Sequence, residues 1–227
     1  MTISASIFSG LQRLQRAGRP LDLLNLHQGA PIVYAATVQA LDEEVATLRV
    51  PGFEIVCLTL EPTTILLSQM LEEAVSARVL AVDLRAGTAV LGQFRYASSR
   101  VGDRMTVRVA PQPAAPVSLE YGDHVFAGQL ADVSISGVGL HLPSVQAALL
   151  RPRGVVRLRL ELPGLGTDAL SLSGTIRFVR SDGAQSRVGV VFAQDVQTLA
   201  ILHYVRDRQE AILAELRTLH QARLAAG

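Results

Sequence analysis

The 227-residue chain contains no tryptophan, no lysine and a single cysteine. Because lysine is absent, all 21 basic residues are arginine, whose planar guanidinium group suits phosphates and flat rings. The lone Cys57 excludes an internal disulfide and a cysteine-based zinc site. Its place in the apolar run FEIVCLTL predicts a buried strand residue.

Long apolar runs and a strong charge imbalance are also missing. No stretch reaches the roughly 18 apolar residues of a membrane span, and the first residues lack the pattern of a signal peptide. The formal net charge of +1 argues against a nucleic acid polymer as partner. Since 49% of the residues are hydrophobic, we expect a packed core. The missing membrane span and signal-peptide pattern lead us to expect a soluble, cytoplasmic protein.

The residue patterns of common enzymes and metal sites do not occur. The five histidines lack metal-site spacing, and the chain has neither a Gly-x-Ser-x-Gly elbow nor a phosphate-binding loop with lysine. GVGLHL lacks the third glycine and the following helix of a dinucleotide site. We therefore expect a protein that is not an enzyme, with no catalytic residues, no metal ligands and no cofactor.

Apolar periodicity divides the chain into four segments. Residues 1–24 predict a short amphipathic helix with its lead-in, and residues 195–227 predict a long C-terminal helix that starts at Asp195. Alternating residues over 25–98 and 99–194 predict two small antiparallel β-barrels in tandem, joined by a basic and proline-rich connection. The predicted fold class is mainly β.

Two stretches of the first barrel segment match at six positions with one offset of 41 residues, beginning with Ala36 and Ala77. We interpret them as two similar hairpins, although constraints shared by all hairpins would produce the same matches. TTILLSQMLEEAV between them predicts a short helix. In the C-terminal helix, the first half is expected to pack on a barrel, and the second half to pair with a partner or a second copy. An approximate heptad seam there comprises Leu202, Val205, Ile212, Leu216 and Leu219.

The strongest functional signal lies in the second barrel segment. Arg100, Arg104 and Arg108 recur at every fourth residue of a polar stretch that we expect to be extended from about residue 105. Taken alone, they fit a basic linker as well as an anion site. Further along, DVSISGVGL places Asp132 and Ser134 on one strand face, available to a ligand. The opposite, buried face would hold Val133 and Ile135.

Taken in this order, Arg104-x-x-x-Arg108 and Asp132-x-Ser134-x-x-Gly137 resemble the motifs of the PilZ domain family, over residues 99 to about 200. The resemblance implies binding of cyclic di-GMP, a bacterial second messenger with two guanines and two phosphates. Arg104 and Arg108 would contact phosphates and lie against guanine faces. Asp132 would accept hydrogen bonds from the N1 and N2 edge of guanine. Ser134 would bond the same ring, and Gly137 would let the chain turn close to the ligand.

One residue departs from the family pattern. Asp103 stands directly before Arg104, where the family often has a basic or apolar residue. An acid there would repel phosphate or pair with Arg104, and Arg100 would compensate as a further ligand-binding candidate. The affinity and the number of ligand molecules therefore stay open.

The preceding β segment is similar to the N-terminal (PilZN-like) domain of two-domain flagellar brake proteins. This resemblance implies an effector that changes its interdomain arrangement on binding cyclic di-GMP and regulates motility. Its partner would be a protein of the flagellar motor or basal body, to which it would be recruited. The alternative is a ligand-independent adaptor with a PilZ fold that binds pilus or secretion machinery. Both a monomer and a dimer remain open.

Overall fold

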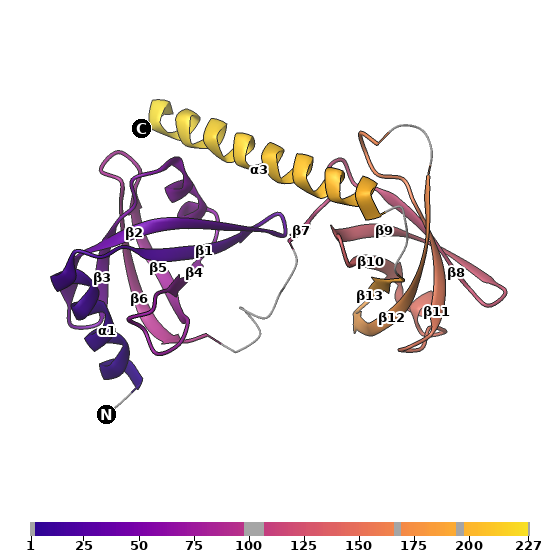
Figure 1. The fold of residues 1–227 in the computed structure, drawn as a ribbon, viewed down its shortest axis with the longest axis horizontal. Coiled ribbons are helices and arrows are strands. Elements are labelled where there is room, and N and C mark those ends of the chain that lie inside the picture. Colours follow the sequence, from indigo (N-terminus) through magenta and orange to yellow (C-terminus); the bar gives the residue numbers. More distant parts are fainter. Residues whose placement is uncertain (1–2, 98–106, 166–168, 194–197, 227) are drawn as a thin grey trace. The chain divides into compact units, whose positions relative to one another are not determined.

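The computed structural model describes residues 3–97, 107–165, 169–193 and 198–226. The fold is mainly β and contains two closed six-stranded antiparallel barrels, an N-terminal helix and a long C-terminal helix, which confirms the predicted fold class. Contacts divide the chain into two units (Figure 1). The first unit comprises Met1–His27, Pro31–Met105 and Ile212–Gly227, and the second comprises Gln28–Ala30 and Thr106–Ala211.

The first unit begins with a helix whose apolar face is buried. Helix α1 (Ile3–Ala17) buries Ile7, Leu11 and Leu14, which recur at helical spacing, and ends before Gly18. The barrel follows in the strand order β1-β2-β3-β6-β5-β4, and a 3-10 helix, η1, precedes β4. The bounds are β1 (Leu21–His27), β2 (Ala30–Asp42), β3 (Val45–Arg49), η1 (Phe53–Thr59), β4 (Thr63–Leu67), β5 (Val75–Asp83) and β6 (Thr88–Tyr96).

The two predicted hairpins are present as β2–β3 and β5–β6. Each contains a register shift, between Val38 and Ala40 in the first hairpin and between Val79 and Ala81 in the second. These positions correspond at the 41-residue offset. The sequence similarity therefore extends to the position of a β-bulge in each hairpin.

Three local predictions in this unit were wrong. The apolar run FEIVCLTL is the 3-10 helix η1, although Cys57 is buried as expected. TTILLSQMLEEAV begins with strand β4, because closure of the barrel requires a strand between β1 and β5. Strand β1 begins at Leu21, so the end of the predicted lead-in 1–24 is already part of the barrel.

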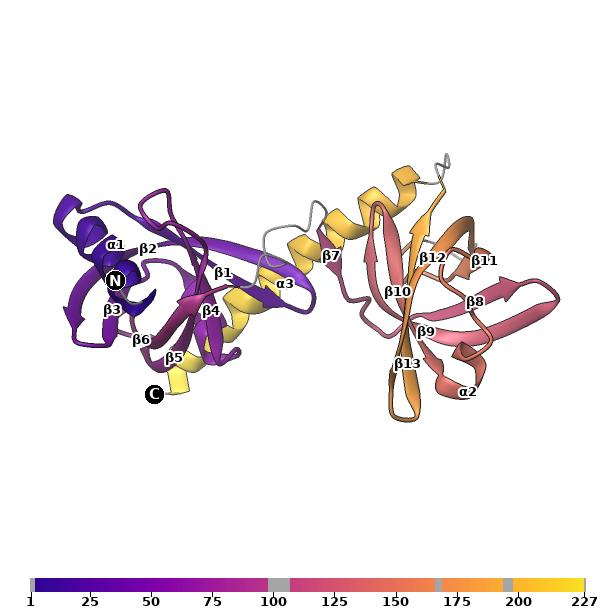
Figure 2. The ribbon, with the colours of Figure 1, turned by 90° about the horizontal axis from the view of Figure 1, so that it is seen from below.

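The second unit holds the other barrel, in the order β10-β13-β12-β11-β8-β9, closed by pairing of β9 with β10 (Figure 2). The short strand β7 pairs with the end of β9. In β11, Val156, Leu158 and Leu160 are buried and Arg157 and Arg159 are exposed, as the alternation predicts. The bounds are β7 (Arg108–Val109), β8 (Pro116–Tyr121), β9 (His124–Ser134), β10 (Gly137–Pro143), α2 (Ser144–Ala147), β11 (Val155–Leu160), β12 (Leu170–Asp182) and β13 (Gln185–Phe192).

Helix α3 (Thr198–Ala226) contributes residues to both units. Ile201 and Val205 are buried in its first half, while Leu202 of the predicted seam is exposed. In its second half, Ile212 and Leu216 are buried within the first unit rather than left for a partner or a second copy. The predicted start at Asp195 lies outside the described residues. Of the helices in the described ranges, none is long and apolar enough to cross a membrane.

Candidate functional site

The two predicted motifs meet at the end of strand β9, within the second unit. In the β7–β9 ladder, Arg108 lies directly opposite Ser134. On the other edge of β9, Ser134 pairs with Gly137 and Asp132 pairs with Gly139 of β10. Because directly opposite residues share a face, Arg108 is placed beside Ser134 and diagonally from Asp132. The sheet therefore brings Arg108 and Asp132 together across 24 residues of sequence.

Asp132 is a buried carboxylate that accepts hydrogen bonds from two arginines. The residue is 5% exposed. Its Oδ1 atom lies 3.2 Å from a terminal nitrogen of Arg108, and its Oδ2 atom accepts a hydrogen bond from Arg187 of β13. A buried carboxylate is retained only with such compensation, since its isolated charge is costly to desolvate. The three residues, which we call the Asp132 cluster, therefore form one electrostatic unit.

The arginines of this cluster remain open to solvent. The side chain of Arg108 is 36% exposed and that of Arg187 is 49% exposed, whereas the side chain of Asp132 between them is 7% exposed. The Nε atom of Arg108 is buried and has no hydrogen-bond partner among the described residues. Two cations on one anion leave an excess positive charge, so this face suits an anionic group.

Ser134 and Gly137 serve the tight turn between β9 and β10. Ser134 is fully buried and donates a hydrogen bond to the carbonyl oxygen of Gly137 at 2.9 Å. A Cβ atom at Gly137 would lie 2.2 Å from the carbonyl oxygen of Val190 on β13. In this structure the glycine is therefore required by the approach of a neighbouring strand, since its φ is not positive.

Two expectations about this stretch need correction. Asp132 and Ser134 do not form an open face, because the arginines and the turn cover them. Val133 is buried as expected, but Ile135 is 39% exposed, since β9 ends at Ser134 and Ile135 belongs to the turn. The surface that a ligand would meet first is consequently made by the arginines.

The remaining residues to consider are the other predicted arginines, the acid beside them, and one arginine that was not predicted. Arg100, Arg104 and Asp103 lie outside the described residues. Arg187, by contrast, was missed by sequence reasoning. Its segment, RVGVVF, fits the order of strands in the PilZ resemblance but was given no ligand role, and its proximity to Asp132 follows from the placement of β13 beside β10. Neither motif spacing nor periodicity predicts that neighbourhood.

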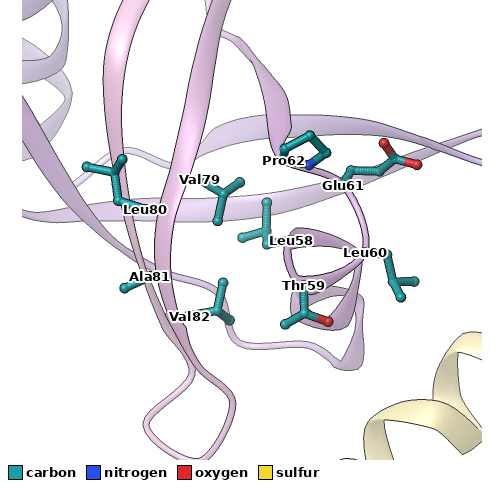
Figure 3. Close-up of a pocket in the computed structure, with 9 residues that line it drawn as sticks. All are labelled: Leu58, Thr59, Leu60, Glu61, Pro62, Val79, Leu80, Ala81 and Val82. Carbon is teal, nitrogen blue, oxygen red and sulfur yellow. The ribbon is translucent and has the colours of Figure 1, made fainter.

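A separate hollow lies on the first unit, between the end of η1 and strand β5 (Figure 3). Its volume is about 480 Å³, and Glu61 is its one charged lining residue among those described. Its other lining residues are Leu58, Thr59, Leu60, Pro62, Val79, Leu80, Ala81 and Val82. None of these lining side chains is a cation, in contrast to the Asp132 cluster, so they provide no positive charge for an anion. Across the described ranges, no group of three or more metal-ligating side chains occurs.

Comparison with known proteins identifies the second unit. Residues 101–206 match the family model of the PilZ domain. An uncharacterized protein of Aquifex aeolicus (strain VF5) is 32% identical over 125 residues, covering 54% of this chain and 57% of that protein. The chain thus spans little more than half the length of this curated relative.

Two solved structures are among those to which the chain is similar. The inhibitor of motility MotI/DgrA of Bacillus subtilis is 12% identical with a TM-score of 0.45, covering 85% of this chain and 96% of that one. YcgR from Escherichia coli, in complex with c-di-GMP, is 14% identical with a TM-score of 0.40, covering 97% and 94%. Because both TM-scores are low, the identification depends on the family model. Residues 101–206 therefore match the PilZ domain, the family that the two motifs predict for this part of the chain.

Proposed function

We propose that this protein is a cyclic di-GMP-binding effector rather than an enzyme. The observation that carries the proposal is the Asp132 cluster, a buried carboxylate held between two partly exposed arginines in a PilZ domain. The carboxylate matches the paired N–H donors of a guanine edge, and guanidinium groups match phosphates and the faces of flat rings. Cyclic di-GMP presents both kinds of group.

In the proposed complex, Asp132 accepts hydrogen bonds from the guanine edge, and Arg108 binds phosphate with its charged donors. Arg104 supplies a second cation, and Arg100 is a further candidate for the same role. Ser134 and Gly137 keep the turn beside Asp132 tight. Ligand contacts of this kind would favour one interdomain arrangement over another, provided that the affinities for the two arrangements differ.

Titration calorimetry with cyclic di-GMP tests this proposal. Wild-type protein is expected to bind at micromolar ligand. Asp132→Ala and Arg108→Ala should each weaken binding by about 1.5–3 kcal/mol, as for lost hydrogen bonds to charged groups. Arg159→Ala, which removes an exposed arginine from β11, is the matched control and should bind as wild type. Absence of binding by folded wild-type protein would refute the proposal.

A second candidate function follows from the same cluster. Both oxygens of Asp132 already accept hydrogen bonds from the protein's own arginines. We therefore consider a PilZ-fold adaptor that binds pilus or secretion proteins without any ligand. In such a protein the carboxylate of Asp132 would keep its two arginines as permanent partners. Calorimetry separates the two, since the adaptor gives no ligand heat.

For the cellular role, we propose regulation of motility through a protein of the flagellar motor or basal body, as in a flagellar brake. A swimming assay at raised cyclic di-GMP, with and without this protein, tests that role. Equal swimming in the two strains would contradict it. X-ray scattering of the full chain with and without ligand tests the interdomain change separately.

A further inference from the structure

Arg187 stands outside both sequence motifs, yet it contacts the residue at the centre of the candidate site. It belongs to β13 and donates a hydrogen bond to Oδ2 of Asp132, while Arg108 occupies Oδ1. Its side chain is half exposed. Arg187 therefore has access both to the buried carboxylate and to a molecule arriving from solvent.

The sheet register explains how a residue of β13 reaches Asp132 two strands away. Asp132 lies directly opposite Gly139 of β10, which in turn lies opposite Gly189 of β13. A Cβ atom at Gly139 would lie 2.9 Å from the Oδ2 atom of Asp132. The missing side chain thus lets the carboxylate lie over β10, toward the strand that carries Arg187.

The positive face continues beyond Arg187. On β13, Arg187 is two residues before Gly189, so the two share a face of the strand. Arg180 of β12 lies directly opposite Arg187, and its guanidinium carbon lies 4.9 Å from the ring centroid of Phe178. The row of cations therefore runs from Arg108 on β7, past the buried Asp132, to Arg180 on β12.

Charge and donor number both favour a further partner for Arg187. Each guanidinium group carries five N–H donors, and one carboxylate shared by two arginines accepts only a part of them. The cluster combines two positive charges with one negative charge. A ligand with two phosphates would balance the excess positive charge of the cluster. Because its two phosphates point in different directions, such a ligand needs cations on more than one side.

We propose that Arg187 is a third arginine of the ligand site and binds a phosphate of cyclic di-GMP. This inference rests on the proposed function. As Asp132 accepts the N1 and N2 donors of guanine, the guanidinium group of Arg187 moves from the carboxylate to a phosphate oxygen. Gly139 permits this exchange, because it leaves the space over β10 to the carboxylate.

A double-mutant cycle tests this role by titrating cyclic di-GMP into full-length variants. Arg187→Ala is measured in the wild type and in Asp132→Asn, whose amide still offers an acceptor to guanine. A direct phosphate contact predicts at least about tenfold weaker binding in both backgrounds. Arg187→Lys, which keeps the charge, should recover a part of the loss. Arg159→Ala is again the control, and thermal melts establish that each variant is folded.

Each other result overturns the inference. If Arg187→Ala binds cyclic di-GMP as tightly as wild type or more tightly, Arg187 only competes with the ligand for Asp132. If Arg187→Ala weakens binding in the wild-type background but not in the Asp132→Asn background, Arg187 acts only through the carboxylate. If folded wild-type protein binds no ligand, the proposed function fails and this inference fails with it. Binding by wild type with no effect of Arg187→Ala sinks the inference alone.

Discussion

The two barrels share an architecture, but a buried network in the first is neutral, whereas one in the second is charged. In the first, the Asn25 side chain accepts hydrogen bonds from the hydroxyls of Tyr34 (2.8 Å) and Thr64 (2.9 Å) and donates to the carbonyl oxygen of Thr63 (3.1 Å). This network is neutral and closed. The second barrel also buries a charged group, the carboxylate of Asp132, and the partners of this carboxylate are partly exposed arginines.

The difference indicates which barrel is built for stability and which for binding. Neutral groups that satisfy one another inside a barrel gain nothing from an added ligand. A buried carboxylate between solvent-exposed arginines can exchange partners, because the arginines retain access to water. The following predictions test this contrast, beginning with the largest expected effect.

Gly137→Ala should destabilise the second barrel strongly and leave the first unchanged. The added methyl group would lie 2.2 Å from the backbone carbonyl oxygen of Val190, and backbone atoms of a central strand cannot move away cheaply. We expect a loss of about 3 kcal/mol or more. Hydrogen exchange of the full chain should speed up in β9, β10 and β13, while the rates in β1 to β6 stay constant.

Gly122→Ala provides the matched control for this prediction. Gly122 has a positive φ of 58° and no atom within 4 Å of the added methyl group. The free energy of unfolding of Gly122→Ala should therefore fall by only about 1 kcal/mol, which is the cost of the left-handed backbone alone. Equal losses in the two variants would show that crowding at Val190 is not what requires glycine at position 137.

Asn25→Ala should destabilise the first barrel by about 2–3 kcal/mol, because the Tyr34 and Thr64 hydroxyls lose their shared buried acceptor. Tyr34→Phe removes one of the donors and leaves the acceptor satisfied, so it should lose only about 1 kcal/mol. The rate at which a thiol reagent alkylates the buried Cys57 measures how often this unit opens. Its rate should rise about thirtyfold or more in Asn25→Ala, following the population of the open form. Similar rates in both variants would contradict a closed network.

Much of the fold was predictable because local pattern and tertiary role agree. The alternation in VVRLRLEL fits only a half-buried strand, and both repeated hairpins contain turn residues between their two strands. The failures occur where a pattern is ambiguous. A continuous apolar run such as FEIVCLTL fits a buried strand and a buried helix alike. In TTILLSQMLEEAV, the need to close the ring between β1 and β5 outweighs a helical stripe.

The candidate site divides in the same way. Asp132 and Arg108 were found from their motifs, and the register of β7 against β9 places them together. Arg187 was missed because its contact spans 55 residues and depends on strand order, which spacing does not encode. The exposure of Ile135 was missed because a strand end shifts easily by one residue, and the turn already begins there.

The smallest predicted effect is the change of stability with pH that the buried thiol of Cys57 causes and the Asp132 cluster does not. Burial, together with the nearby charges of Glu54 and Glu61, raises the pKa of Cys57 to about 12. In the unfolded chain a thiol loses its proton near pH 8.5. Above that pH the unfolded state is favoured by ionisation and the folded state is not, so stability falls as pH rises toward 12.

Between about pH 9 and pH 10 this thiol should lower the free energy of unfolding by about 1 kcal/mol. Urea unfolding at the two pH values, followed by circular dichroism, measures the change. Cys57→Ala removes the ionisable group and should show a drop smaller by that amount, since every other titrating group is common to both proteins. Equal drops would mean that the thiol is accessible to solvent. Arg108→Ala should instead keep the wild-type drop, because guanidinium groups stay charged throughout this range and the thiol is untouched.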